Sequence, residues 1–364
     1  MIHPPIPFPL ERWYARYETR TTHNLSGATV LPPRLDELPT PPPDLRLTYG
    51  YSHGHPALVD AIAAYHPGAT PANVLVTHGS AEALYLLQRV LLTAGDRFVT
   101  PNPCYGALFL TGEEVGAQRI PWEVPWRDAD PWESWDAALT HTPALVVVNS
   151  PHNPTGHTVS AADLERMAAD VRRIGSRLIV DEVQRELQPD PPPPIFSMDP
   201  KAVSVGSFSK SFGLPGLRLG WIVADPAIIE ACSALRDRTT ICSSPLTEAI
   251  ATAVLLEAPK WIARSWAMTA PNRALLEDWL ADQPYLRGVV PEAGLTAFIR
   301  VWMQWPTLDL CDYLAETFGL LVAPGDYFGQ PGFVRFGLGN DPNHFADGLT
   351  RLRSGLDAYI PRTR

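Results

Sequence analysis

The chain has 364 residues, 45% of them hydrophobic and 19% charged, a composition typical of an ordinary globular protein with room for two domains. Its formal net charge of −10 argues against a nucleic acid or an anionic membrane as the main partner. The four cysteines are scattered without zinc-type or disulfide spacing, so we expect inert thiols, no bound metal and a reducing compartment, the cytoplasm. The first residues lack a charged segment followed by a long apolar run, so we expect neither a signal peptide nor a membrane span.

From about residue 70, short apolar runs alternate with stretches of helical periodicity. Residues 81–92 and 160–173 are predicted helices, the second with Ser160 as its N-cap. The predicted buried strands are 73–77, 144–149, 177–181, 202–206 and 219–224. Strands that alternate with helices predict an α/β fold with a mainly parallel central sheet, covered by helices on both faces. In such a sheet, ligands bind beyond the carboxyl ends of the strands.

The pattern changes after about residue 245. Helical stretches at 246–256 and 261–280 precede two stretches, 294–301 and 333–338, that are predicted to be antiparallel strands. We therefore expect a smaller α+β domain at the C-terminal end, with part of the N-terminal segment packed against it. The expected units are an N-terminal segment that closes on the active site at 1–44, a large cofactor-binding domain at 45–245 and a small domain at 246–364.

Segment 207–221 carries the most informative residues of the chain. Lys210 lies among small hydroxyl residues and glycines, eight residues before Arg218. A lysine amine can bond covalently to an aldehyde cofactor, and Ser207, Ser209 and Arg218 are suited to hold a phosphate group. The alternative, for a lysine in a glycine-rich turn, is an ordinary surface residue.

Two further groups follow predicted strands. Asp181 ends a buried strand, where an unpaired charge is costly, so we expect it to have a cationic partner. Ser80 and Ala81 begin a helix after a glycine turn, and the free amides of a helix N-terminus bind phosphate. A structural salt bridge is the alternative for Asp181.

Taken in chain order from about residue 45 to 340, these motifs resemble those of fold-type I pyridoxal 5′-phosphate (PLP) enzymes, the aminotransferase class I and II family. The resemblance implies PLP as the cofactor, bonded to Lys210, with Asp181 on the protonated pyridine nitrogen. It also assigns Asn153, in Asn-Pro-Thr-Gly, to the phenolic oxygen of PLP, and Tyr105 to the face of its ring. A tyrosine of the hydrophobic core is the alternative for Tyr105.

The same resemblance extends to the amino-acid substrate. Arg335 matches the arginine that pairs with the substrate α-carboxylate, and Ser26 and Gly27 match the N-terminal loop that closes over that group. An exposed strand arginine is the alternative for Arg335. Where aminotransferases usually carry a tyrosine, three residues after the pyridine aspartate, this chain has Gln184. An amide can still donate to the phenolic oxygen but is a weaker acid than a phenol, which weakens the expectation of transamination.

A tyrosine of the family reaches across a subunit interface to the cofactor phosphate of the partner. Tyr49, five residues before Gly54, matches it, which implies a homodimer with shared active sites. Tyr51 and His53 are the alternatives for this contact.

A narrower resemblance is to the hydroxyarginine cyclases that form capreomycidine or enduracididine. The segments that carry it are 9–14, 77–85, 211–221, 236–246 and 324–330. It implies PLP-dependent dehydration and intramolecular cyclisation of a hydroxylated L-arginine, with Lys210 as the base. A guanidinium substrate needs acidic or carbonyl partners. Glu11, Glu18 and Asp237 are the candidates, and a solvated surface carboxylate is the alternative for each.

Two other activities remain open on the same scaffold. An amino-acid aminotransferase or a C–S lyase would use the same lysine and the same cofactor. The sequence does not fix the position of the substrate hydroxyl, the ring size or the stereochemistry.

Overall fold

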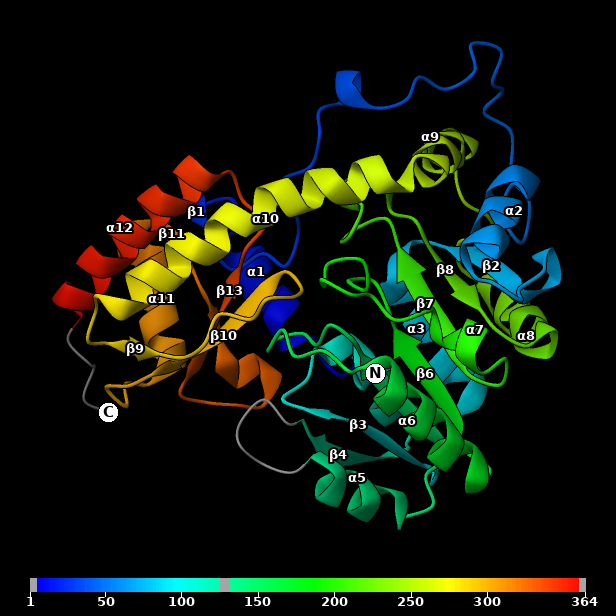
Figure 1. Cartoon of the computed structure of the whole chain (residues 1–364), viewed down its shortest axis with the longest axis horizontal. Helices are drawn as coiled ribbons and strands as arrows, with labels where there is room; N and C mark the ends of the chain where they lie inside the picture. The colour runs from blue at the N-terminus through cyan, green and yellow to red at the C-terminus, as the bar shows by residue number, and fades with distance from the viewer. Residues whose placement is uncertain (1–4, 125–130, 360–364) are drawn as a thin grey trace, which may run out of the picture.

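The computed structural model describes residues 5–124 and 131–359. A seven-stranded sheet in the order β2-β8-β7-β6-β5-β3-β4 forms its larger part (Figure 1). The strands are β2 (Val74–Thr77), β3 (Arg97–Asn102), β4 (Gln118–Glu123), β5 (Leu145–Asn149), β6 (Arg177–Asp181), β7 (Val203–Ser207) and β8 (Gly220–Val223). β8 is antiparallel to β2 and β7, and the other pairs of this sheet are parallel. The predicted α/β fold with a mainly parallel sheet is confirmed.

Both faces of the sheet are buried, which explains why its strands are continuous apolar runs. In β5, Leu145 and Val147 pack on one face with α3 (Gly79–Leu91) and α8 (Pro226–Arg236). Val146 and Val148 pack on the other face with α5 (Pro131–Leu139) and α6 (Ala161–Arg173). Further along this second face lie α2 (Pro56–Tyr65) and α9 (Pro245–Leu256). Ser160 caps α6 as predicted, because its side chain accepts from the backbone N–H of Asp163 at 3.1 Å.

The sequence pattern does not predict strands β3 and β4. Each contains a proline, which lacks the N–H needed to donate a hydrogen bond within a sheet. Pro121 is tolerated because β4 is an edge strand. Pro101 lies beyond the part of β3 that pairs with β5, since that pairing is formed by Phe98 and Val99.

A four-stranded antiparallel sheet in the order β12-β13-β10-β9 organises the smaller part of the molecule. Its strands are β9 (Leu286–Arg287), β10 (Thr296–Val301), β12 (Ala323–Pro324) and β13 (Phe333–Gly337), so the two predicted antiparallel strands are confirmed. The long helix α10 (Ala258–Ala281) runs from the region of α9 to this sheet, where α11 (Thr307–Phe318) and α12 (Pro342–Ala358) also pack (Figure 1).

The N-terminal segment joins this smaller part rather than the large sheet. In α1 (Pro9–Tyr17), Leu10, Trp13 and Tyr17 are buried in the same hydrophobic core as β10 and β13. β1 (His23–Asn24) pairs in parallel with β11 (Leu320–Leu321). Short helices complete the chain: α4 (Leu110–Glu114), α7 (Ile195–Met198) and the 3₁₀-helices η1 (Leu35–Glu37), η2 (Pro71–Asn73), η3 (Gly106–Leu108), η4 (Pro215–Leu217) and η5 (Gly325–Phe328). Within the described ranges, no helix combines the length and the apolar character needed to cross a membrane.

Candidate active site

A cavity of about 410 Å³ lies at the carboxyl ends of the large sheet, where the fold predicts a ligand site. Most of the predicted site residues line it: Gly27, Ser80, Ala81, Tyr105, Asn153, Asp181, Gln184, Ser209, Lys210, Arg218 and Arg335. They come from the N-terminal segment, the starts of α3 and η3, the ends of β5 and β6, the turn after β7, and β13. Residues that are far apart in sequence therefore converge on one space.

Three predicted site residues lie outside the cavity lining. Ser207 is buried, and its hydroxyl is bonded to the backbone of Leu219 and Ser209. Ser26 is also buried, and only its backbone carbonyl is turned to a site residue, Arg335. Tyr49 is 85% exposed on the surface of the chain.

Lys210 differs in its surroundings from the two other lysines of the chain, which are exposed. The side chains of Lys201 and Lys260 are 68% and 70% exposed and pair with surface carboxylates. Lys210 is enclosed by the cavity, and desolvation, reinforced by the positive charge of Arg335, lowers its pKa from 10.5 to about 8. Roughly a tenth of its amine is therefore uncharged at pH 7, against about one part in three thousand for an ordinary lysine.

Asp181 faces the same cavity from the end of β6 and is 6% exposed. Its carboxylate accepts the backbone N–H of Val183 at 3.2 Å, and within the described residues no cation lies within ion-pair distance of it. Burial raises its pKa to about 6, although the Val183 N–H and the charge of Lys210 oppose this shift. A buried acid in this state is suited to a cationic ligand atom.

Another part of the cavity lining is suited to an anion. Ser80 and Ala81 lie at the N-terminus of α3, whose first amides have no helical partner. Arg218 lies beside them, with Nη1 3.5 Å from the Ser209 hydroxyl and no carboxylate in ion-pair distance within the described chain. Gly79 permits this approach, because its φ is +77° and a Cβ there would lie 2.9 Å from Nη2 of Arg218.

Arg335 is a second guanidinium, 2% exposed and without a carboxylate partner in the part of the chain that the structure describes. It donates to Asn153 Oδ1 at 3.0 Å, the Tyr14 hydroxyl at 2.8 Å and the Ser26 carbonyl at 2.7 Å. These contacts use three of the five N–H groups of the guanidinium, and its buried Nε has no partner. A buried, oriented cation of this kind is suited to bind a carboxylate.

Gln184 presents the donor side of its amide to the cavity. Its Oε1 accepts the backbone N–H of Leu295 at 2.7 Å, which fixes the assignment of oxygen and nitrogen. The NH₂ group is therefore the part left to interact with a ligand. Asn153 is oriented in the same way, since Arg335 occupies its Oδ1.

Comparison with known proteins identifies the family. The model of the aminotransferase class I and II family matches residues 44–352. The chain belongs to this family. It is 32% identical over 318 residues to capreomycidine synthase of Streptomyces vinaceus, across 85% of this chain and 81% of that protein. It is 30% identical to the arginine–pyruvate transaminase AruH of Pseudomonas aeruginosa, across 73% and 70% of the two chains.

Solved structures of the same class superpose closely. The PLP-dependent cyclase OrfR matches with a TM-score of 0.92 at 31% identity, and 98% of each chain is covered. The resemblance to fold-type I enzymes and the predicted cofactor PLP are therefore confirmed.

The residues of the cavity fit PLP at both ends. Ser209, Arg218 and the first amides of α3 would hold its phosphate, and Lys210, which lines the same cavity, would bond to its aldehyde. Asp181, which lacks a protein counter-ion, is suited to its pyridinium nitrogen. The NH₂ groups of Asn153 and Gln184 remain for its phenolic oxygen.

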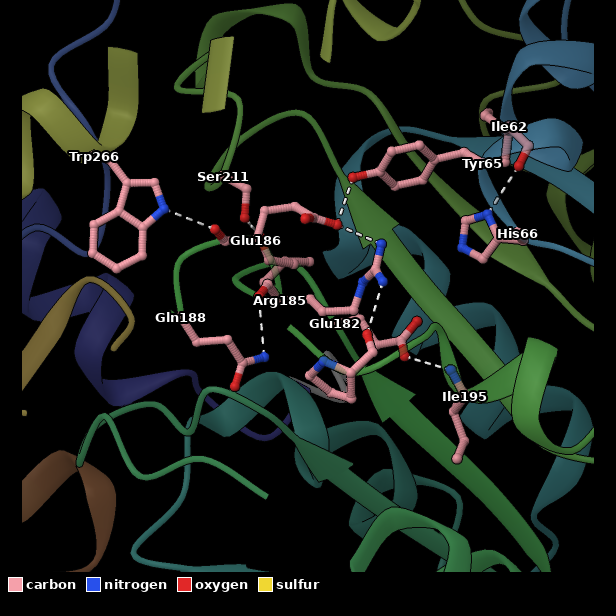
Figure 2. Close-up of polar contacts among 12 residues, drawn as sticks. Ile62, Tyr65, His66, Glu182, Arg185, Glu186, Gln188, Ile195, Ser211 and Trp266 are labelled. Carbon is pink, nitrogen blue, oxygen red and sulfur yellow. Dashed lines mark hydrogen bonds and ion pairs between the residues drawn. The ribbon is translucent and has the colours of Figure 1, made fainter. Parts of the chain in front are cut away.

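A largely buried polar network fixes the turn that follows β6, from Glu182 to Gln188 (Figure 2). The Arg185 guanidinium pairs with Glu186, whose carboxylate also accepts the Tyr65 hydroxyl at 2.5 Å. The indole of Trp266 in α10 donates to the Glu186 carbonyl at 3.0 Å. The turn after β6 is thus held by α2 on one side and α10 on the other.

We expect Arg185→Met to lower the free energy of unfolding by about 3 kcal/mol, because it leaves the Glu186 carboxylate, on a side chain only 16% exposed, without its cation. The matched control is Arg173→Met, which removes an exposed pair with Asp170 and should cost less than about 1 kcal/mol. Urea unfolding followed by tryptophan fluorescence measures both. Equal losses in the two variants would show that the network does not hold the turn.

The structure adds cavity residues that the motifs did not assign. Tyr14, one turn after Glu11 in α1, is the hydroxyl that orients Arg335. Of the three candidate carboxylates for a guanidinium, Glu11 and Glu18 line the cavity. Asp237 does not; it is exposed at the C-terminal end of α8. The spacing of 11, 14 and 18 places these residues on one helix face, but the sequence gives no sign of what that face meets.

Proposed function

We propose that the protein catalyses the PLP-dependent dehydration and intramolecular cyclisation of a hydroxylated L-arginine to a cyclic guanidino amino acid of the capreomycidine or enduracididine type. The observation that carries the proposal is the similarity to capreomycidine synthase and to a PLP-dependent cyclase over most of the chain. The cavity is consistent with such a substrate, because its lining includes arginines and carboxylates that have no counter-ion among the described residues.

Bound PLP supplies an electron sink for the electrons released at the substrate Cα. Arg335 binds the α-carboxylate and thereby orients the Cα–H bond. The Lys210 amine, with its lowered pKa, accepts that proton and can return it. The substrate hydroxyl leaves as water, and a guanidine nitrogen forms the new C–N bond at the carbon that lost it. A 3-hydroxy substrate closes a six-membered ring. A 4-hydroxy substrate needs a further deprotonation, at Cβ, before its hydroxyl can leave, and it closes a five-membered ring.

An amino-acid aminotransferase is the second candidate, with a C–S lyase on the same lysine as a third. The aminotransferase candidate is favoured by the similarity to AruH, whose name describes transamination of arginine. Gln184, in place of the usual tyrosine, weighs against it. The amide cannot supply the phenolic proton that a tyrosine would share with the cofactor oxygen.

Product analysis separates these candidates. The holoenzyme is incubated with 3- or 4-hydroxy-L-arginine, with and without pyruvate or 2-oxoglutarate, and the products are examined by mass spectrometry. Cyclisation predicts a product lighter by one water, with every nitrogen retained and no need for an oxo acid. A keto acid that forms only with the oxo acid would replace the proposal with transamination.

We also propose a cytoplasmic homodimer in which the N-terminal segment, 1–44, closes on the active site formed by 45–245 and 246–364. Gly27 and Glu11 of the first segment line the cavity, which supports this division. All four cysteines are free, which supports a reducing compartment. In Figure 1, the segment around η1 and on toward α2 extends away from the main body, leaving Tyr49 exposed.

If Tyr49 contacts the phosphate in the partner's site, Tyr49→Phe should weaken PLP binding roughly 10-fold, the effect of losing a hydrogen bond to a charged group. Tyr51→Phe, at the alternative position, is the matched control. Equilibrium dialysis measures PLP retention, and sedimentation should give twice the chain mass of 40.0 kDa. A monomer, or a PLP affinity that Tyr51→Phe lowers and Tyr49→Phe does not, would contradict this arrangement.

A further inference from the structure

One face of α1 turns carboxylates toward the cavity. Leu10, Trp13 and Tyr17 fix the opposite face in the core, and the Trp13 indole donates to Asp312 at 2.8 Å. This leaves Glu11, Tyr14 and Glu18 on the cavity side, so the carboxylates are carried by an anchored helix rather than by a mobile loop.

Glu11 is the inner of the two carboxylates. Its Oε1 accepts the Tyr105 hydroxyl at 3.1 Å, and its charge acts on Lys210, whose pKa it raises against the stronger effect of desolvation. Glu18 is exposed, near the mouth, and lies about 10 Å further along the helix axis. Within residues 5–124 and 131–359, no basic side chain lies within ion-pair distance of either carboxylate.

The cavity therefore holds two kinds of charge that have no oppositely charged partner among the described residues. Arg335 is a buried cation suited to a carboxylate, and Glu11 is a carboxylate that accepts a hydrogen bond from Tyr105 through Oε1. Tyr14 links the two, because it hydrogen-bonds Arg335 from the turn that follows Glu11. A ligand that matches both must carry a carboxylate at one end and a cation at the other.

We propose that Glu11 binds the guanidinium of the substrate, and that Glu18 attracts the cationic side chain at the mouth. The site then selects basic amino acids over neutral ones. Guanidinium and carboxylate groups form paired, charge-assisted hydrogen bonds, and the contact between Tyr105 and Glu11 presets the geometry. This inference rests on the proposed function, because it assigns Glu11 to the guanidine of hydroxyarginine, whose nitrogen forms the new ring bond.

Spectroscopic titration of the holoenzyme tests the inference by following the visible cofactor band as L-arginine or L-norleucine is added. L-norleucine is the neutral probe, and its binding also shows that a variant is folded. We expect Glu11→Gln to weaken L-arginine binding about 10- to 100-fold and L-norleucine binding less than about 2-fold. Glu18→Gln should mainly slow L-arginine association at low salt. The matched control, Asp237→Asn, removes the candidate carboxylate outside the cavity and should change neither.

Two results would overturn the inference: equal losses for both ligands in Glu11→Gln, or unchanged L-arginine binding in that variant. The proposed function fails separately. If the wild type binds L-arginine through Glu11 but converts hydroxyarginine to a keto acid, the inference stands and cyclisation falls. If Glu11→Gln cyclises hydroxyarginine as well as the wild type, the inference falls and the proposed function stands.

Discussion

Replacement of Lys210 by alanine should reduce turnover by about four orders of magnitude or more. General acid–base catalysis alone contributes about 10²- to 10⁴-fold, and Lys210→Ala also removes the covalent link to the cofactor. Lys201 and Lys260, the other lysines of the chain, are exposed and lie outside the cavity lining, so neither can substitute. Steady-state turnover of hydroxyarginine measures the loss.

The matched control for Lys210→Ala is Lys201→Ala, which removes an exposed lysine and should leave turnover unchanged. After borohydride reduction, wild-type protein should carry the mass of PLP on the peptide that contains Lys210, and Lys210→Ala should carry none. An added primary amine should restore part of the activity, more strongly as pH rises, because only the uncharged amine accepts a proton. Residual turnover within about 10-fold of wild type would contradict the assignment of Lys210 as the base.

Replacement of Asp181 by asparagine should lower turnover about 10²- to 10⁴-fold. The change is nearly isosteric but removes the negative charge that, in our proposal, holds the cofactor nitrogen protonated. The loss of one partner of a buried charge pair costs about 3–5 kcal/mol, and each 1.36 kcal/mol corresponds to a factor of ten in rate. The carboxylate is 6% exposed and has no protein counter-ion within the described residues, so its charge is available to the cofactor.

Asp181→Asn should lower turnover without lowering the attachment of the cofactor. The borohydride-stable attachment to Lys210 should persist, because the amine and the phosphate-binding groups are unchanged. An enzyme with normal attachment and normal turnover would show that the carboxylate at the end of β6 does not act on the cofactor. Absence of PLP from the variant would instead assign Asp181 to cofactor binding rather than to the reaction.

The sequence predicts most of the large sheet because buried strands leave a simple local signature. The runs at 144–149 and 177–181 are apolar on both faces and match β5 and β6 closely. The signature fails where a second constraint is present. Pro101 and Pro121 obscure β3 and β4, since only the sheet order shows that their missing donors lie where no pairing is required.

Lys210 and Asp181 can be predicted from the sequence because each belongs to a short local motif. The substrate end is not local. Tyr14 and Arg335 are 321 residues apart and meet only after α1 packs against β13. Ser207 illustrates the converse case: its motif suggests a phosphate ligand, but a serine can bond the amide two residues later, and in the structure its hydroxyl does so.

We propose that one cavity holds both charged ends of the substrate, the α-carboxylate on Arg335 and the guanidinium on Glu11. The most direct test is a crystal structure of the Lys210→Ala variant with PLP and L-arginine bound. The α-carboxylate should lie within hydrogen-bonding distance of Arg335, and the guanidinium within hydrogen-bonding distance of Glu11. An arginine side chain that points away from α1, or a carboxylate bound anywhere other than Arg335, would contradict the account.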